Sequence, residues 1–109
     1  MAYNENLVEK VRSLLRRRKG ITEKKMFGGI AFMHHGNMSC GVTDDRLMVR
    51  VGADNYEACL KRKHVREMDF TGRPLKGFIY VMPEGIKRRD GLQRWVETGL
   101  SFTKTLPKK

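Results

Sequence analysis

The side chains of this sequence best suited to metal binding or nucleophilic catalysis are two histidines and a cysteine. His34 and His35 are adjacent, and Cys40 follows across an expected hairpin. Adjacent side chains of a strand point to opposite faces, so the two imidazoles are poorly placed to share one metal ion, although one of them could act with Cys40. The sequence has no C-x-x-C pair, the spacing typical of zinc sites. We therefore expect ordinary strand histidines and no metal site.

The two cysteines, Cys40 and Cys59, each lie inside an apolar pattern. Two cysteines are too few for a disulfide framework, and thiols stay reduced in the cytosol. We expect two buried free thiols, with a redox pair as the alternative. A nucleophilic Cys40 would need a histidine base on the neighbouring strand. The alternation of Met38, Cys40 and Val42 instead places all three on one face as core side chains.

The glycine pair Gly28 and Gly29 resembles a phosphate-binding loop only superficially. The P-loop pattern G-x-x-x-x-G-K-[ST] is absent, and these glycines precede a strand rather than a helix. They predict a bulge or a close backbone approach at the start of that strand. Asp44 and Asp45 are typical of a turn. With no carboxylate pair, Ser-His-Asp order or cofactor motif, we expect no enzyme activity, no catalytic residue and no cofactor.

Positive charge is the strongest chemical feature of the sequence. Of 109 residues, 23 are Lys or Arg and 12 are Asp or Glu, which gives a formal net charge of +11. Residues 1–25 hold 8 basic and 3 acidic side chains, residues 26–59 hold 2 and 4, and residues 60–109 hold 13 and 5. Such an uneven field attracts polyanions, either nucleic acid or acidic protein surfaces. A role in solubility alone is the alternative.

Ten cations are candidate contacts to a partner or to phosphate. Arg46 and Arg50 are four apart in an expected strand and share one sheet face, while Arg73 lies in a later loop. The ten are Arg16, Arg17, Arg18, Lys19, Arg46, Arg50, Lys61, Arg62, Lys63 and Arg73. If nucleic acid is bound, the footprint joins the clusters outside the central strands, including Lys87, Arg88, Arg89, Lys104, Lys108 and Lys109. Binding would then neutralise phosphates without reading bases.

The first half of the chain predicts one helix and three strands. The helix begins at Asn4 or Asn6, either of which can cap it, and it ends with the basic run 16–19 before Gly20. Its buried side chains recur at helical spacing: Leu7, Val8, Val11, Leu14 and Leu15. Three strands follow, joined by short turns, which predicts an antiparallel meander. We expect these strands at 30–34, 37–43 and 47–51.

The second half predicts a helix, two strands and a final helix. Asp54 and Glu57, and again Asp90 and Gln93, have the spacing of a capping box at a helix start. The two strands are expected at 67–70 and 78–82, separated by a turn at 71–74. In the final helix, Gly99 predicts a close approach to another backbone. Trp95 is expected to pack on the sheet with Leu7, Val11 or Leu14.

The elements follow the order α-β-β-β-α-β-β-α. This order predicts one α+β domain over residues 1–109, a two-layer sandwich with helices against a five-stranded antiparallel sheet. A tail at about residues 105–109 is expected to be flexible. The sequence has no apolar run approaching the ~20 residues of a membrane helix and no recognisable signal peptide. We therefore expect a cytoplasmic protein that does not bind membranes.

Several motifs together resemble the TfoX (Sxy) N-terminal domain family. They are Met26-Phe27-Gly28-Gly29, the hairpin from Gly36 to Val42, the strand Leu47 to Val51, Met68 to Phe78 with Thr71-Gly72-Arg73-Pro74, and Trp95-Val96 with Gly99-Leu100-Ser101-Phe102. The resemblance covers about residues 8 to 107. It implies a two-layer fold grouped with secretion-chaperone-like folds. The family is named after regulators of natural competence in bacteria that act with the transcription machinery, and it supplies no catalytic residues.

The resemblance therefore implies a non-enzymatic regulatory or interaction module with protein partners. The longer competence regulators carry a second, C-terminal domain, and this chain is interpreted as a single-domain member. The alternative function is that of a basic accessory protein binding nucleic acid non-specifically. A homodimer remains open. The seven methionines are expected to be adaptable core residues, with an adaptable partner-binding surface as the alternative.

Overall fold

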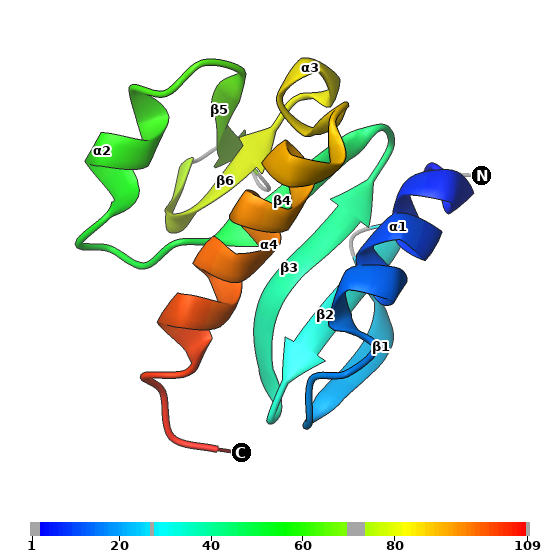
Figure 1. Ribbon diagram of the computed structural model, residues 1–109. Coiled ribbons are helices and arrows are strands. Elements are labelled where there is room, and N and C mark those ends of the chain that lie inside the picture. The colour runs from blue at the N-terminus through cyan, green and yellow to red at the C-terminus, as the bar shows by residue number, and fades with distance from the viewer. Residues whose placement is uncertain (1–2, 27, 70–73, 109) are drawn as a thin grey trace.

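The computed structural model describes residues 3–26, 28–69 and 74–108, and it shows one antiparallel sheet with helices packed against it (Figure 1). The strand order in the sheet is β1-β2-β3-β4-β6-β5. The elements are α1 (Glu5–Leu15), β1 (Ile21–Met26), β2 (Gly29–His34), β3 (Asn37–Thr43), β4 (Arg46–Arg50), α2 (Tyr56–Leu60), β5 (Val65–Asp69), β6 (Pro74–Val81), α3 (Pro83–Ile86) and α4 (Arg89–Thr103). The α+β class and the antiparallel sheet are confirmed.

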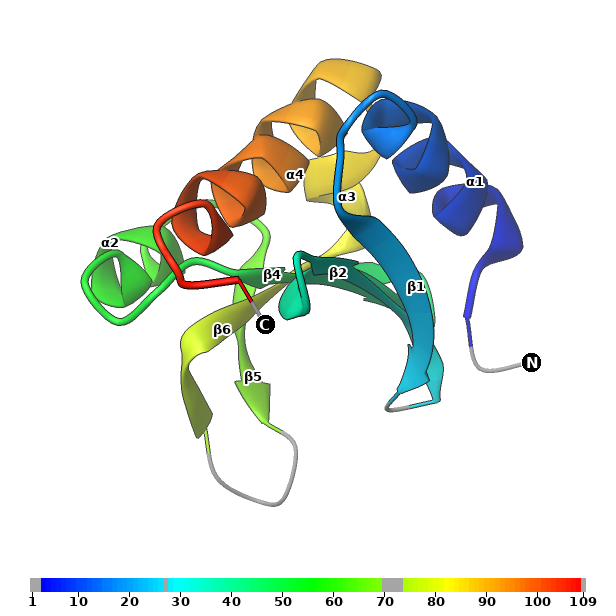
Figure 2. The same cartoon turned by 90° about the horizontal axis from the view of Figure 1, so that it is seen from below.

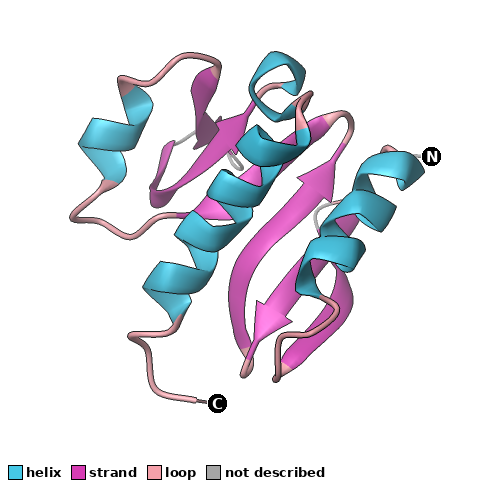
Figure 3. Ribbon diagram, viewed as in Figure 1, coloured by secondary structure: helices cyan, strands magenta, loops and turns pink. Residues whose placement is uncertain are grey.

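The helices cover only one face of this sheet. Figure 2 shows α1, α3 and α4 on one side, with α2 beside the β4–β6 end, and Figure 3 shows the same two layers by element type. The main core lies between the layers and includes Val11, Phe32, Val49, Ile79 and Trp95. We call the uncovered side, which carries Met48, Met68 and Tyr80, the helix-free face.

Helix α1 begins as expected but is shorter than the sequence indicated. The Asn4 side chain caps it by accepting a hydrogen bond from the backbone N–H of Leu7 at 3.1 Å. The helix ends at Leu15, so the prediction that Arg16 to Lys19 form its last turn is wrong. The chain must turn here to enter β1, and Gly20 provides a positive φ of 79° directly against the imidazole of His35.

The sheet has six strands rather than the five expected, because β1 is an additional strand. Four of its six residues are exposed, so the sequence lacks the alternation of a half-buried strand. Two interactions hold this edge strand: it pairs with β2 along its whole length, and Glu23 accepts two hydrogen bonds from the guanidinium of Arg12 at 2.6 and 2.7 Å. Lysines on an edge strand also discourage pairing with other chains.

A β-bulge at Ser39 turns the Met38 side chain to the face of the sheet opposite to the predicted one. The pairing with β2 passes from Phe32 opposite Cys40 to Met33 opposite Met38, which leaves Ser39 as an extra residue in β3. Cys40 and Val42 lie in the main core, as predicted. Met38 instead packs against the cluster on the helix-free face, so its expected place beside Cys40 is wrong.

The helix starts of the second half also differ from the sequence predictions. Helix α2 is capped at Asn55 and α4 at Arg88, in both cases without a side-chain cap, so neither capping box forms. The segment expected only to end a strand forms the short helix α3, with Pro83 in its first turn. The predicted strands correspond to β5 and β6, but both begin earlier than expected. Strand β5 starts at Val65, and β6 starts at Pro74, which was expected in the turn. Phe70 and the rest of that turn, residues 71–73, lie outside the described residues.

Two glycine predictions are confirmed by the backbone packing. A Cβ on Gly99 would lie 2.6 Å from the carbonyl oxygen of Ser39, so this glycine lets α4 approach β3 closely. A Cβ on Gly29 would lie 2.0 Å from the carbonyl oxygen of Val42, as expected for a close approach at the start of β2. Gly28 before it has a positive φ of 73°.

Candidate functional site

The helix-free face is curved, and the β1–β2 and β5–β6 ends of the sheet project away from the helices on this side (Figure 2). Its floor is apolar. Met48, Met68 and Tyr80 are buried there, and Met38, Phe78 and Met82 pack against them while remaining partly exposed. Met33 lies opposite Met38 in the register and faces the same way. Five of the seven methionines thus gather on one face.

One line of paired residues crosses this face from edge to edge. Consecutive pairings in the sheet join six residues, which we call the cross-sheet row: Lys24, Ala31, Gly41, Met48, Tyr80 and Arg66. Both ends of the row are cationic and exposed, while its four central residues are buried. Adjacent strands lie about 4.8 Å apart, so the row spans about 24 Å.

The two predicted arginines of β4 also lie on the helix-free face, as expected from their spacing. The guanidinium of Arg46 lies 4.1 Å from the centre of the Tyr80 ring and donates to the Asp44 carboxylate at 3.3 Å. Its Nε is buried and has no hydrogen-bond partner in the described part of the chain. Arg50 lies between two rings, 5.4 Å from Phe78 and 5.3 Å from Phe102. Stacking on aromatic faces holds both guanidinium groups in place.

Cations outnumber carboxylates on the helix-free face, where Asp44 of the β3–β4 turn is paired with Arg46. The strand pairings and the alternation within each paired strand place these cations on this face: Lys24, Arg46, Arg50 and Arg66. Glu23 and Glu67 belong to the neighbouring row on the opposite, helix-covered face, since they lie in register with Phe32 and Ile79 of the core. Sequence reasoning missed Lys24 and Arg66, because their meeting on one row depends on pairings between distant strands.

The remaining predicted cations do not form one footprint. The run at 16–19 lies in the α1–β1 connection, where Arg18 is ion-paired with Glu97 of α4. The run at 61–63 follows α2, and the guanidinium of Arg62 lies 4.2 Å from the centre of the Trp95 ring. Trp95 and Glu97 are two residues apart, which places them about 200° apart around the helix. The two basic runs therefore lie on opposite sides of α4, and Arg73 lies outside the described residues.

The cysteines and His34 are packed among core and sheet residues and are not grouped as a reactive or metal-binding site. Both thiols are free and buried, as predicted, and burial raises the pKa of Cys40 to about 12. The residue opposite Cys40 is Phe32 rather than a histidine. His34 Nδ1 lies 3.0 Å from the hydroxyl of Thr103, and burial together with the nearby positive charges lowers the pKa of His34. Among the described residues, no group of three or more His, Cys, Asp or Glu side chains could hold a metal ion.

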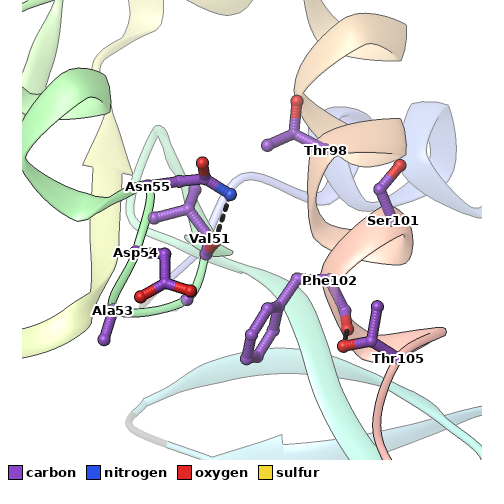
Figure 4. A pocket seen from close by; sticks show the side chains of 9 residues that line it. Val51, Ala53, Asp54, Asn55, Thr98, Ser101, Phe102 and Thr105 are labelled. Carbon is purple, nitrogen blue, oxygen red and sulfur yellow. Dashed lines mark hydrogen bonds between the residues drawn. The ribbon is translucent and has the colours of Figure 1, made fainter.

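A cleft of about 580 Å³ lies between the segment after β4 and the end of α4 (Figure 4). Phe102 stands beside the backbone of Gly52 in this cleft. Two of its polar side chains bind their own segments: Asn55 donates to the Val51 carbonyl and Thr105 to the Phe102 carbonyl. The cleft has no predicted cation in its lining, and no sequence motif indicated it.

The fold and the helix-free face define a class of small α+β domain with one helix-covered and one open sheet face. The family model described as TfoX N-terminal domain matches residues 13–103, so the chain belongs to this family. No curated protein and no solved structure matches the chain. The grouping with secretion-chaperone-like folds stays a prediction. Within the described ranges, no helix has the length and apolar character needed to span a membrane.

Proposed function

We propose that this domain is a non-enzymatic regulatory module that binds protein partners through its helix-free face. The observation that supports the proposal most directly is the joint placement there of three partly exposed methionines, Met33, Met38 and Met82, and of four cations. Methionine side chains are flexible and polarizable, so they adapt to apolar surfaces of different shapes. Arginines next to such a surface favour acidic partners. A role in the transcriptional regulation of competence is the specific form of this proposal that the family resemblance implies.

The aromatic rings of the helix-free face favour protein over single-stranded nucleic acid. Sheets that bind single strands stack bases on exposed aromatic rings. Here the Tyr80 ring is buried and has the guanidinium of Arg46 above it, and Arg50 lies near the partly exposed Phe78. A base would have to displace these cations before it could stack. A protein side chain can instead bind beside them.

An affinity experiment with a nuclease control tests the proposed function. The full chain is immobilised and exposed to lysate of the source organism, with and without nuclease. Proteins retained after nuclease are purified and titrated against the chain by calorimetry. We expect at least one of them to bind saturably as a purified protein. Loss of every captured protein on nuclease treatment would contradict the proposal.

A second candidate function is non-specific binding of nucleic acid on the helix-covered side. Four cations that line clefts around the start of α4 make no ion pair within the described residues: Lys63, Lys87, Arg89 and Arg94. Arg62 lies among them, next to Trp95. Unpaired cations in this number favour phosphate contacts. Titration of duplex DNA at low salt tests this candidate, and the absence of binding at micromolar protein would remove it.

A further inference from the structure

We propose that the helix-free face binds an acidic amphipathic helix of a partner protein, laid along the cross-sheet row. This inference rests on the proposed function and specifies the chemistry of the partner. The helix would place long apolar side chains over the partly exposed Met33, Met38 and Met82, and carboxylates near Lys24 and Arg66 at the two ends of the row.

On the helix-covered face of the same sheet, a helix already binds one charged end of the neighbouring row. The row next to the cross-sheet row faces the helices, contains Phe32, Cys40, Val49 and Ile79, and ends in Glu23 and Glu67. Helix α1 buries Val11 in that core and places Arg12 on Glu23, with two hydrogen bonds of 2.6 and 2.7 Å. This contact lowers the pKa of Glu23 through the hydrogen bonds from Arg12.

The helix-free face has the same layout with the charges reversed. Its central residues are apolar or small, and its ends are Lys24 and Arg66 in place of two glutamates. A helix that fits it therefore needs carboxylates where α1 has an arginine. At a rise of 1.5 Å per residue, about 16 residues of helix cover the row of about 24 Å.

The positive charge of the helix-free face favours an acidic helix over a second copy of the chain as its binding partner. A symmetric dimer through the helix-free face would bring four cations against the same four: Lys24, Arg46, Arg50 and Arg66. Like charges brought together at an interface oppose association. The described strand positions of this face contribute no carboxylate, and Asp44 of the β3–β4 turn is already paired with Arg46, so an acidic partner is favoured over self-association.

The test uses a synthetic 16-residue peptide with leucine and glutamate at amphipathic helical spacing. Its matched controls are the same peptide with lysine in place of glutamate and a 16-nucleotide oligothymidylate. Binding to the full chain is followed by fluorescence anisotropy, and the contact surface by NMR of ¹³C-labelled methionine methyl groups. We expect the acidic peptide to bind at micromolar concentration and to shift the methyl signals of Met33, Met38 and Met82. The lysine peptide is expected not to bind.

Two charge reversals locate the binding surface. Arg66→Glu and Lys24→Glu are exposed and are each expected to weaken binding of the acidic peptide about fivefold or more, because an attraction becomes a repulsion. Arg94→Glu changes the net charge equally on the helix-covered side and is the matched control, with a change below about twofold. Thermal unfolding of each variant establishes that it is folded.

Four results would overturn the inference: no binding of the acidic peptide, equal weakening by Arg94→Glu, methionine shifts produced by the oligothymidylate, or self-association of the free chain through this face. The proposed function is distinguished by repeating the affinity experiment with Arg66→Glu. If purified partners bind the wild type and this variant equally, the module function stands and the assignment of this face falls. If no purified partner binds the wild type, the function itself fails.

Discussion

Replacing Gly99 with alanine tests whether the stability of the fold depends on the close contact between α4 and β3. In a solvent-exposed helix this change stabilises by about 1 kcal/mol, because glycine is a poor helix former. Here the new Cβ would lie 2.6 Å from the carbonyl oxygen of Ser39, whereas ordinary contacts begin at 3.4 Å. Helix α4 must therefore move away from β3 by about 0.8 Å, or the bulge at Ser39 must give way by the same amount.

The cost of this movement follows from what α4 buries. Its side chains in the core are Leu92, Trp95, Val96 and Leu100. Burial of such side chains contributes about 1.5–3 kcal/mol each, or about 6–12 kcal/mol together. A gap of 0.5–1 Å loses about a quarter or more of the contact energy, here about 1.5–3 kcal/mol. After the gain of about 1 kcal/mol in helix propensity, we expect Gly99→Ala to lower the free energy of unfolding by about 0.5–2 kcal/mol.

Urea unfolding followed by Trp95 fluorescence measures this difference. Ser101→Ala, at an exposed position of the same helix, is the matched control and is expected to change stability by less than about 0.5 kcal/mol. If Gly99→Ala proves more stable than the wild type by the amount that helix propensity alone predicts, the argument from close packing is refuted.

Three further predictions concern the core, the pH response and the basic surface. Trp95→Ala should lower the free energy of unfolding by about 3–5 kcal/mol, and a wild-type emission spectrum typical of a solvated indole would contradict its burial. His34 has a lowered pKa in the fold, so the unfolded chain binds its proton more readily, and stability should fall as the pH drops below about 6.5. Urea midpoints at pH 8 and 5.5 should therefore differ less for His34→Gln than for the wild type. If duplex DNA binds with about five phosphate contacts, the log–log salt slope should be near −4.5, and replacing Lys63, Arg89 and Arg94 with glutamine should flatten it while the circular dichroism spectrum stays unchanged.

Local patterns in the sequence predicted those elements whose burial repeats at regular spacing. The alternation of β4 places Leu47 and Val49 in the core and Arg46 and Arg50 on the other face, as expected. The spacing in α4 identified its buried side, and Gly99 within it indicated a close approach to another backbone, which the structure shows to be that of Ser39. These predictions succeeded because each one depends on the secondary structure of a single segment.

The wrong or missing predictions have one physical cause: the structure at these positions depends on pairing between segments that are separate in the sequence. Strand β1 has no buried alternation of its own and is held by β2 and by Arg12. The bulge at Ser39 appears only when β3 is paired with β2, and it moves Met38 to the other face. The cross-sheet row combines Lys24 and Arg66 from the two edge strands. No pattern within either strand alone could bring these two cations together.

The C-terminal segment is joined to the sheet by a contact that sequence reasoning could not supply. The side-chain amide of Asn37 donates a hydrogen bond to the carbonyl oxygen of Pro107 at 2.9 Å. Asn37 is buried at the start of β3, and the Thr103 hydroxyl contacts His34 of the adjoining strand. The flexibility expected for residues 105–109 stays a prediction, which hydrogen exchange can measure.

The strand order also determines how this chain assembles its fold. Neighbours in sequence pair in every case but one, since β6 joins β4 only after α2 and β5 have been traversed. The strands β1 to β4 and the hairpin of β5 with β6 are thus two units built from short-range contacts. Pairing of β4 with β6 joins these two units and closes the longest loop between paired strands of the sheet. Because closing a long loop costs chain entropy, we expect this step to contribute most to the folding barrier. Substitutions of Val49 or Ile79 at that seam should therefore slow folding more than substitutions within either unit.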